Sequence, residues 1–423
     1  MNLLLAGISH RTAPVAIRER YVFPEADPEA PLRSLAEEDT LAESMVLSTC
    51  NRVEALAAAM DRERAEGALR GWLARAHGHS LEAIAPYIYL YEDGEVARHV
   101  FRVASSLDSL VVGEPQILGQ LKSAYQAACT ANTVGPLLNR LLHRAFSVAK
   151  RVRTETGVAE AAISVSSMAV QLAMRIFDTL SDKHVVLLGA GEMIETAARH
   201  LRAQGAGEML VLNRTLERAE ALARSVGAEA GPLEALDEEL PRADIVLTSL
   251  ADAPGTVTAA AVREALRHRD NRTMFLIDIA VPRNVDPAVN DLGNVYLYNL
   301  DDLAELADAN AEGRQAEAQR AEAIVREEAE SFMRWFSSLD AVPTITSLTG
   351  FGEAVRRAEL DKAIAALGPL SDAQRRVLDG LTNAIVRKLL HRPIARIREE
   401  SESGGGKSRI AAAKDLFRLD DES

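Results

Sequence analysis

The chain has 423 residues, of which 48% are hydrophobic and 26% charged, and its formal net charge is −14. Domains typically contain roughly 100–200 residues, so this length predicts two to four of them. The acidic balance argues against general nucleic-acid binding, although a local basic patch is compatible with it. No apolar run approaches the roughly 20 residues of a membrane-spanning helix, so we expect no membrane segment. Two cysteines in so long a chain indicate a reducing compartment, and we expect the protein to be cytoplasmic.

Residues 1–90 alternate between strand and helix patterns. Their order predicts the βαββαβ arrangement of a ferredoxin-like sandwich. The expected elements are strands Leu3–Ser9, Ser44–Ser48, Val53–Met60 and Tyr87–Tyr91, with helices Pro28–Glu38 and Asp61–His77. Apolar spacing becomes helical from Gly94 to about Arg153. Between these helices, Ser105–Gln120 is dense in small polar groups, and such loops on a rigid scaffold favour a binding site.

The turn between the second and third expected strands carries a thiol beside a guanidinium, in Ser48-Thr49-Cys50-Asn51-Arg52. A thiolate is a strong nucleophile, and nearby positive charge or hydrogen-bond donors favour it over the thiol. Arg52 could supply that charge or bind a substrate carboxylate. A buried cysteine taken alone is more often a small apolar residue, here one that fills a strand end.

A second domain begins where a buried strand, 183–188, runs into Gly189-Ala190-Gly191 and a helix from Glu192. The alternating pattern that follows predicts a Rossmann-type, doubly wound parallel sheet. Its further elements are strands Glu208–Asn213, Asp244–Ser249 and Met274–Ile279, with helices Thr215–Ser225 and Ala259–Leu266. Gly-x-Gly lets the backbone approach a pyrophosphate at the helix N-terminus, with Ile194 where a third glycine often stands. A tight turn without a ligand is the alternative.

The second strand of this domain ends at Asn213-Arg214-Thr215, where nucleotide preference is decided. An arginine with polar neighbours suits the 2′-phosphate of NADP(H), whereas the alternative is a surface charge. His99, on a helix expected at Glu95–Leu107, is either an acid/base group or a packed residue. Cys129 lies among alanines on an expected helix, which predicts a structural role for it. No His and Cys set has zinc-ligand spacing, so we predict no metal.

The last quarter of the chain is rich in helix formers. Asp301–Leu339 predicts a helix on the order of 60 Å long, ended by Pro343, which is either a spine that joins parts of the chain or a dimer element. Helices from about Glu353 to Ile397 predict an all-α final domain, and Ser401–Gly406 a flexible link. The predicted division is an N-terminal α+β catalytic domain (1–155), a nucleotide domain (156–300), the spine (301–340) and a C-terminal helical domain (341–423).

A thiol nucleophile together with a nicotinamide site predicts a reaction class. The thiol forms a thioester with an activated acyl group, and hydride reduces the thioester to an aldehyde. Arg52 indicates an acidic substrate.

Several stretches together resemble the glutamyl-tRNA reductase family, from residue 1 to about 340. They are Gly7–Pro14, Leu47–Arg52, Leu107–Gln120, Ser147–Thr156 and Asp278–Arg283. The resemblance implies that Cys50 attacks the ester of glutamyl-tRNA(Glu) and releases the tRNA. NADPH then reduces the thioester to glutamate-1-semialdehyde, which commits glutamate to tetrapyrrole synthesis. It also implies a spinal helix, a homodimer through the C-terminal helices, and product transfer to the semialdehyde aminotransferase.

The resemblance implies roles for individual residues as well. His99 takes a supporting catalytic role. The implied substrate-binding residues are Thr49, Asn51, Arg52, Ser109, Glu114, Pro115, Gln116 and Gln120. The implied cofactor-binding residues are Gly189, Ala190, Gly191, Glu192, Met193 and Ile194, joined by Asn213, Arg214 and Thr215.

Two basic segments could contact tRNA phosphates despite the acidic total, or they could be ordinary solvated helix faces. The first contains Arg140, His143, Arg144, Lys150, Arg151 and Arg153, and the second contains Arg387, Lys388, His391, Arg392, Arg396 and Arg398.

Two other functions compete with this one. A quinate/shikimate-type dehydrogenase would use the same nucleotide domain on a small free acid and would not need Cys50. A non-catalytic tRNA-binding or regulatory protein would have no chemical reason to keep Cys50, Arg52 and Gly-x-Gly together. Hydride transfer needs reacting atoms roughly 3–3.5 Å apart, and a swing of the nucleotide domain toward Cys50 is one hypothesis for how they meet.

Overall fold

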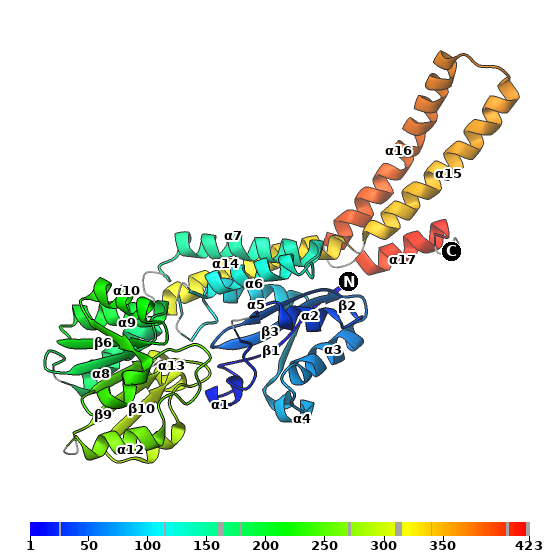
Figure 1. Ribbon diagram of the computed structural model, residues 1–423. Helices are drawn as coiled ribbons and strands as arrows, with labels where there is room; N and C mark the ends of the chain where they lie inside the picture. Colours follow the sequence, from blue (N-terminus) through cyan, green and yellow to red (C-terminus); the bar gives the residue numbers. More distant parts are fainter. Residues whose placement is uncertain are drawn as a thin grey trace. The chain divides into compact units, whose positions relative to one another are not determined.

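The computed structural model describes residues 1–24, 27–110, 112–113, 116–158, 164–177, 179–269, 272–308, 315–339, 341–402 and 406–419 (Figure 1). By its internal contacts the chain divides into two compact units, Met1–Arg326 and Glu327–Ser423. The first unit contains both sheets of the described structure, and the second is helical.

The N-terminal part of the first unit is an antiparallel sheet in the order β2-β3-β1-β4. This order confirms the ferredoxin-like prediction. Helices cover both faces, α2 and α3 on one and α5 to α7 on the other (Figure 1), so every residue of β3 is buried. The elements are β1 (Asn2–Ser9), α1 (Val15–Arg18), α2 (Ala30–Ala36), β2 (Leu41–Ser48), β3 (Arg52–Ala59), α3 (Arg62–Arg75), α4 (Leu81–Ile84), η1 (Ala85–Tyr87), β4 (Tyr89–Glu92), α5 (Gly94–Ala104), α6 (Gln116–Thr130) and α7 (Pro136–Glu155).

The second sheet is parallel, in the order β10-β9-β8-β5-β6-β7. This is the strand order of dinucleotide-binding domains, and it confirms the Rossmann-type prediction. Two edge strands, β7 and β10, were not predicted. The elements are α8 (Val165–Ile176), β5 (His184–Leu188), α9 (Glu192–Ala203), β6 (Glu208–Asn213), α10 (Leu216–Val226), β7 (Glu229–Pro232), η2 (Leu233–Ala235), α11 (Leu236–Glu239), β8 (Ile245–Thr248), α12 (Ala259–Arg267), β9 (Met274–Asp278), η3 (Pro287–Asp291), β10 (Val295–Asn299) and α13 (Leu300–Asp308).

The expected spinal helix corresponds to α13 and α14 (Gln315–Ser338), and residues 309–314 between them lie outside the described residues. The first part of α14 contacts the catalytic domain, because Glu322 accepts a hydrogen bond from Arg102 Nε at 2.7 Å. The prediction that Pro343 ends the spine is wrong: Pro343 lies in the first turn of α15 (Ala341–Leu367). A proline is tolerated there because first-turn N–H groups have no intrahelical acceptor.

The second unit contains the hairpin of α15 and α16 (Asp372–Glu402), followed by α17 (Gly406–Phe417). The expected link at 401–406 is helical at its described ends, while 403–405 lie outside the described residues. A small core joins the helices through Ala341, Leu348, Ile397 and Ala413. In the part of the chain that the structure describes, no helix combines the length and apolarity needed to cross a membrane.

Candidate active site

The turn that carries Cys50 is the tight connection between β2 and β3. Thr49 organises it: its N–H donates to the Arg52 carbonyl at 2.9 Å, and its hydroxyl accepts from the N–H groups of Asn51 and Arg52, each at 3.2 Å. A threonine hydroxyl that binds the backbone two residues ahead stabilises such a turn. Cys50 is therefore held at the tip of the hairpin, and it is half-buried.

Two residues that follow β1 contact the backbone carbonyl groups of the turn. The His10 N–H donates to the Asn51 carbonyl at 2.9 Å, and Arg18 Nε lies 3.5 Å from the carbonyl oxygen of Cys50. Arg18 is 2% exposed. The side chain of Cys50 packs against a hydrophobic cluster that consists mainly of nucleotide-domain residues and also includes Leu110 of the catalytic domain. The thiol thus lies where the catalytic and nucleotide domains meet within the first unit.

Arg52 is the centre of a buried ionic network. It is 1% exposed, and its Nη1 donates to Glu54 Oε1 at 2.8 Å and to Asp108 Oδ2 at 3.2 Å. Its Nη2 donates to the Asp108 carbonyl. Burial lowers the pKa of Arg52, but Glu54, Tyr89 and Asp108 outweigh burial and raise it overall, so the guanidinium stays charged. Nε is the nitrogen without a hydrogen-bond partner among the described residues.

Glu54 links this network to His99. Its Oε1 accepts from Tyr89 Oη at 2.5 Å and lies 2.7 Å from Nε2 of His99. Burial raises the pKa of the Glu54 carboxyl, but His99 and Arg52 more than offset burial and hold the pKa far below its usual value. Nδ1 of His99 lies 3.8 Å from Asp108 Oδ2. The imidazole is therefore fixed between two carboxylates.

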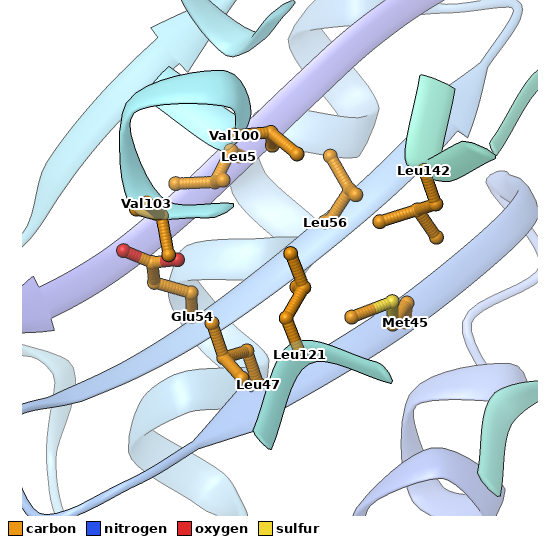
Figure 2. A pocket seen from close by; sticks show the side chains of 9 residues that line it. All are labelled: Leu5, Met45, Leu47, Glu54, Leu56, Val100, Val103, Leu121 and Leu142. Carbon is orange, nitrogen blue, oxygen red and sulfur yellow. The ribbon is translucent and has the colours of Figure 1, made fainter. Parts of the chain in front are cut away.

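The carboxylate of Glu54 lies in apolar surroundings (Figure 2). It lines a small cavity among hydrophobic side chains from β1 to β3 and from helices α5 to α7. The space holds about 10 Å³, roughly what one water needs, so it cannot take a substrate. A carboxylate against such a wall stays ionised only when paired.

Asp108 connects the network to the segment after β1. Arg11 Nε lies 2.6 Å from Asp108 Oδ1. Burial raises the pKa of Asp108, while Arg52, His99 and Arg11 lower it overall. Burial, followed by the charge of Arg52, lowers the pKa of His10 to about 4, so this imidazole is neutral at pH 7.

Several polar atoms around the turn are buried and have no hydrogen-bond partner among the described residues. Native proteins satisfy most buried polar atoms, so such a concentration is expected where ordered water or a polar ligand binds. The atoms are His10 Nδ1, Arg18 Nη2, Asn51 Oδ1, Arg52 Nε, Ser105 Oγ and Ser109 Oγ.

The structure thus brings Thr49, Asn51, Arg52, His99 and Ser109 to one region around Cys50. Of the other predicted substrate residues, Gln116 and Gln120 lie on the first turns of α6, half-buried and exposed respectively. Glu114 and Pro115 lie outside the described residues.

Sequence reasoning missed several partners of these residues. Glu54 carries a detectable signal, because it is a charge inside an otherwise apolar strand. Asp108 lies within the polar segment that the sequence indicated. Arg18 and Tyr89 gave no sequence signal and become visible only through the tertiary contacts already described.

The predicted nucleotide loop lies between β5 and α9. Gly189 has φ of +110°, and a Cβ there would lie 2.6 Å from the Ser249 carbonyl oxygen, so only glycine fits. Gly191 precedes the helix, and a Cβ there would meet nothing within 4 Å. Ala190 is half-buried, Glu192 and Met193 open the helix, and Ile194 is fully buried against the sheet. This cradle at a helix N-terminus suits a pyrophosphate.

Asn213, Arg214 and Thr215 follow the carboxyl end of β6, next to this loop in the sheet order. Asn213 Nδ2 donates to the Thr215 carbonyl at 2.9 Å, and Arg214 Nη2 donates to the Ala251 carbonyl at 2.5 Å. Both arginine and threonine are exposed. The guanidinium therefore lies at the edge where an adenosine ribose binds in this fold.

Two predictions concern residues outside these sites, namely the role of Cys129 and metal binding. Cys129 lies on α6 and, like Cys50, is a thiol. Among the described residues, no group of three or more His, Cys, Asp or Glu side chains is arranged to hold a metal ion.

Comparison with known proteins covers the chain from end to end. Family models match residues 6–156 (glutamyl-tRNAGlu reductase, N-terminal domain), 171–306 (shikimate/quinate 5-dehydrogenase) and 320–419 (glutamyl-tRNAGlu reductase, dimerisation domain). A glutamyl-tRNA reductase of Syntrophotalea carbinolica is 46% identical, over 100% of this chain and 96% of the relative. One from Geobacter sulfurreducens is 47% identical, over 100% and 97%. The solved glutamyl-tRNA reductase from Methanopyrus kandleri is 32% identical and matches 97% of this chain and 98% of that chain, with a TM-score of 0.50.

Proposed function

Because the chain belongs to the glutamyl-tRNA reductase family, we propose that it reduces L-glutamyl-tRNA(Glu) to glutamate-1-semialdehyde with NADPH and releases tRNA(Glu). This reaction is the first committed step of tetrapyrrole synthesis. The full-length similarity to glutamyl-tRNA reductases supports the proposal. The observation that carries it is a cysteine at a hairpin tip, above a buried Arg–Glu–His–Asp network and against a nucleotide domain.

Cys50 is the proposed nucleophile. Its thiolate attacks the ester carbonyl carbon, the C–S bond forms, and the C–O bond to the tRNA ribose breaks, so the tRNA leaves with a free hydroxyl. Arg18 places a positive charge against the backbone of this residue. The turn hydroxyl of Thr49, the amide of Asn51 and Nε of Arg52 are the proposed groups that hold the glutamyl moiety.

His99 and the segment after α5 take supporting roles in this proposal. His99 holds Glu54, and Glu54 holds Arg52, so the histidine orients the guanidinium. Ser109 offers a buried hydroxyl without a partner among the described residues. The resemblance assigns Glu114, Pro115, Gln116 and Gln120 to the same substrate.

The nucleotide loop fits NADPH, which when bound supplies the hydride that converts the thioester to aldehyde and thiol. Gly189, Ala190 and Gly191 give the pyrophosphate access to the backbone, and Glu192, Met193 and Ile194 form the helix turn beneath it. Asn213, Arg214 and Thr215 are the proposed contacts to the ribose and its 2′-phosphate.

Two glycine variants test the loop. Gly189→Ala should lower the free energy of unfolding by about 1–3 kcal/mol, because it combines a positive φ with a clash at a backbone carbonyl. Gly191→Ala should leave stability within about 0.5 kcal/mol but weaken NADPH binding, because its methyl group enters the pyrophosphate's place. Thermal unfolding and NADPH titration measure both effects. Unchanged NADPH affinity in Gly191→Ala would contradict this placement.

A homodimer through the second unit is part of the proposal. The hairpin of α15 and α16 leaves large apolar side chains exposed, and such a surface marks a protein interface. They are Val342, Phe351, Val355, Leu367, Val377, Leu381, Ile385 and Leu389. Transfer of the semialdehyde to its aminotransferase, and a cytoplasmic location, stay predictions from the resemblance and the cysteine count.

Two basic helix faces are proposed to contact tRNA phosphates. Arg140, His143, Arg144, Lys150 and Arg153 are exposed on α7, with Arg151 half-buried beside them. On α16, Arg387, Lys388, His391, Arg392, Arg396 and Arg398 are all exposed. Local positive charge of this kind explains how an acidic protein binds tRNA, and it makes binding salt-sensitive.

NADPH consumption with different substrates tests the proposed function. We expect turnover with glutamyl-tRNA(Glu), and none with uncharged tRNA, free glutamate, shikimate or quinate. Turnover of shikimate or quinate would instead favour the dehydrogenase function that residues 171–306 resemble. Absence of turnover with charged tRNA would favour a binding protein without catalysis.

A further inference from the structure

The short helix α1 is tied at one end to the start of α13 and at the other to the loop after β9 of the nucleotide domain. At its start, the Val15 N–H donates to Asp301 Oδ2 at 2.7 Å. At its end, Glu19 receives a two-pronged ion pair from Arg283, with Nε to Oε2 at 2.9 Å and Nη2 to Oε1 at 2.7 Å. The pKa of Glu19 is raised by burial but lowered further by Arg283, so the carboxylate is ionised.

Arg18 extends this contact to the catalytic turn. Its Nη1 donates to Asp301 Oδ1 and to the Ala13 carbonyl, each at 2.9 Å, while its Nε faces the Cys50 carbonyl at 3.5 Å. A fully buried guanidinium needs an anionic partner, and here Asp301, in the first turn of α13 at the end of the nucleotide domain, supplies it. The backbone of Cys50 is therefore linked through one side chain to the start of α13, directly after β10 of the nucleotide domain.

Both partners of α1 come from the edge of the sheet where nucleotides bind. Arg283 follows β9, and Asp301 lies in the first turn of α13, directly after β10. Dinucleotides bind at the carboxyl ends of parallel strands. Asp278 accepts the N–H groups of Ala280 and Val285 at 3.0 and 2.8 Å, so the loop that presents Arg283 is fixed.

We propose that Arg18 is a positioning residue which, with Asp301 and the Glu19–Arg283 pair, holds Cys50 against the nucleotide-binding edge. The inference rests on the proposed function. Its consequence concerns the thioester, which has two fates. Hydride transfer breaks the C–S bond and gives the semialdehyde, whereas attack by water breaks the same bond and gives glutamate and the thiol. Loosening the contact between α1 and the residues after β9 and β10 should slow hydride transfer and leave the rate of hydrolysis unchanged.

The ratio of glutamate to semialdehyde measures this partition. Arg283→Glu and Glu19→Arg should each raise the ratio by roughly tenfold, because small misplacements slow a reaction strongly. Release of tRNA should stay within about twofold, since Cys50 itself is intact. The double variant Glu19→Arg/Arg283→Glu restores the opposite charges and should return the ratio toward wild type. Asp301→Asn, which removes the charge facing Arg18, should raise the ratio too.

Arg224→Glu is the matched control, because it breaks an exposed ion pair with Glu220 in the same domain. Its ratio should equal that of wild type. An unchanged ratio in the Arg283, Glu19 and Asp301 variants, or a double variant no better than the singles, overturns the inference. Parallel loss of tRNA release and reduction would do so as well. Failure of the proposed function is distinct, because wild type would then neither release tRNA nor form the aldehyde.

Discussion

Replacing Cys50 with serine should abolish NADPH consumption on glutamyl-tRNA, by a factor on the order of 10³ or more. A serine hydroxyl is far less nucleophilic than a thiolate, and His99 is engaged by Glu54, so this imidazole does not act as the general base that a serine would need. Serine preserves the size of the side chain at the hairpin tip, so the fold should persist. Stopped-flow NADPH absorbance and acid-quenched tRNA release would measure the two half-reactions separately, and both should disappear.

Cys129→Ser is the matched control, because Cys129 is the second thiol and lies on α6. We expect its activity to match that of wild type, and trapping of a labelled glutamyl group on protein should depend on Cys50 alone. Turnover that survives Cys50→Ser would place the chemistry elsewhere and leave only the nucleotide domain as a functional assignment. Labelling that follows Cys129 would contradict the assignment of the nucleophile.

The fold could be predicted where one strand or helix carries its own pattern. The strands leading to Thr49 and to Gly189 are apolar runs bounded by turns, and both were located closely. The edge strand β7 was missed because Glu229–Pro232 has no branched or aromatic residue. Gly231 in this strand packs closely against the neighbouring strand β6, because a Cβ there would lie 2.9 Å from Leu212 Cδ2. β10 was missed because it runs into α13 without a loop.

The sequence predicted those parts of the site in which neighbouring residues form a recognisable motif. A cysteine beside an arginine indicated a nucleophile, and a strand running into Gly-x-Gly indicated a nucleotide. The arrangement behind Cys50 could not be predicted, since Arg18 meets Asp301 across 283 residues of sequence. The sequence also indicated that Arg52 binds a substrate carboxylate, whereas in the structure Glu54 and Asp108 already engage its Nη atoms.

Replacing Glu54 with glutamine should be the most damaging change in the buried network. One carboxylate oxygen serves Arg52, His99 and Tyr89 together. Removing one member of a buried ionic set costs about 3–5 kcal/mol, because the remaining charge stays buried without compensation. This is a large share of a typical stability of about 5–15 kcal/mol. Denaturant unfolding should show the loss, and activity per folded molecule should fall by more than about tenfold as Arg52 and His99 lose their orientation.

Glu43→Gln separates this role from burial alone. Glu43 is also buried, but it accepts the Leu137 and Leu138 N–H groups at the start of α7, so its loss should lower stability without affecting activity. The pH profile gives a second readout. The folded-state pKa of Glu54 lies below its usual 4.5, so its contribution is complete above that pH and declines as pH falls. Below pH 4.5 the free energy of unfolding should therefore increase less steeply with rising pH in Glu54→Gln than in wild type. A variant with the wild-type acid profile and wild-type activity would show that Arg52 and His99 do not depend on Glu54.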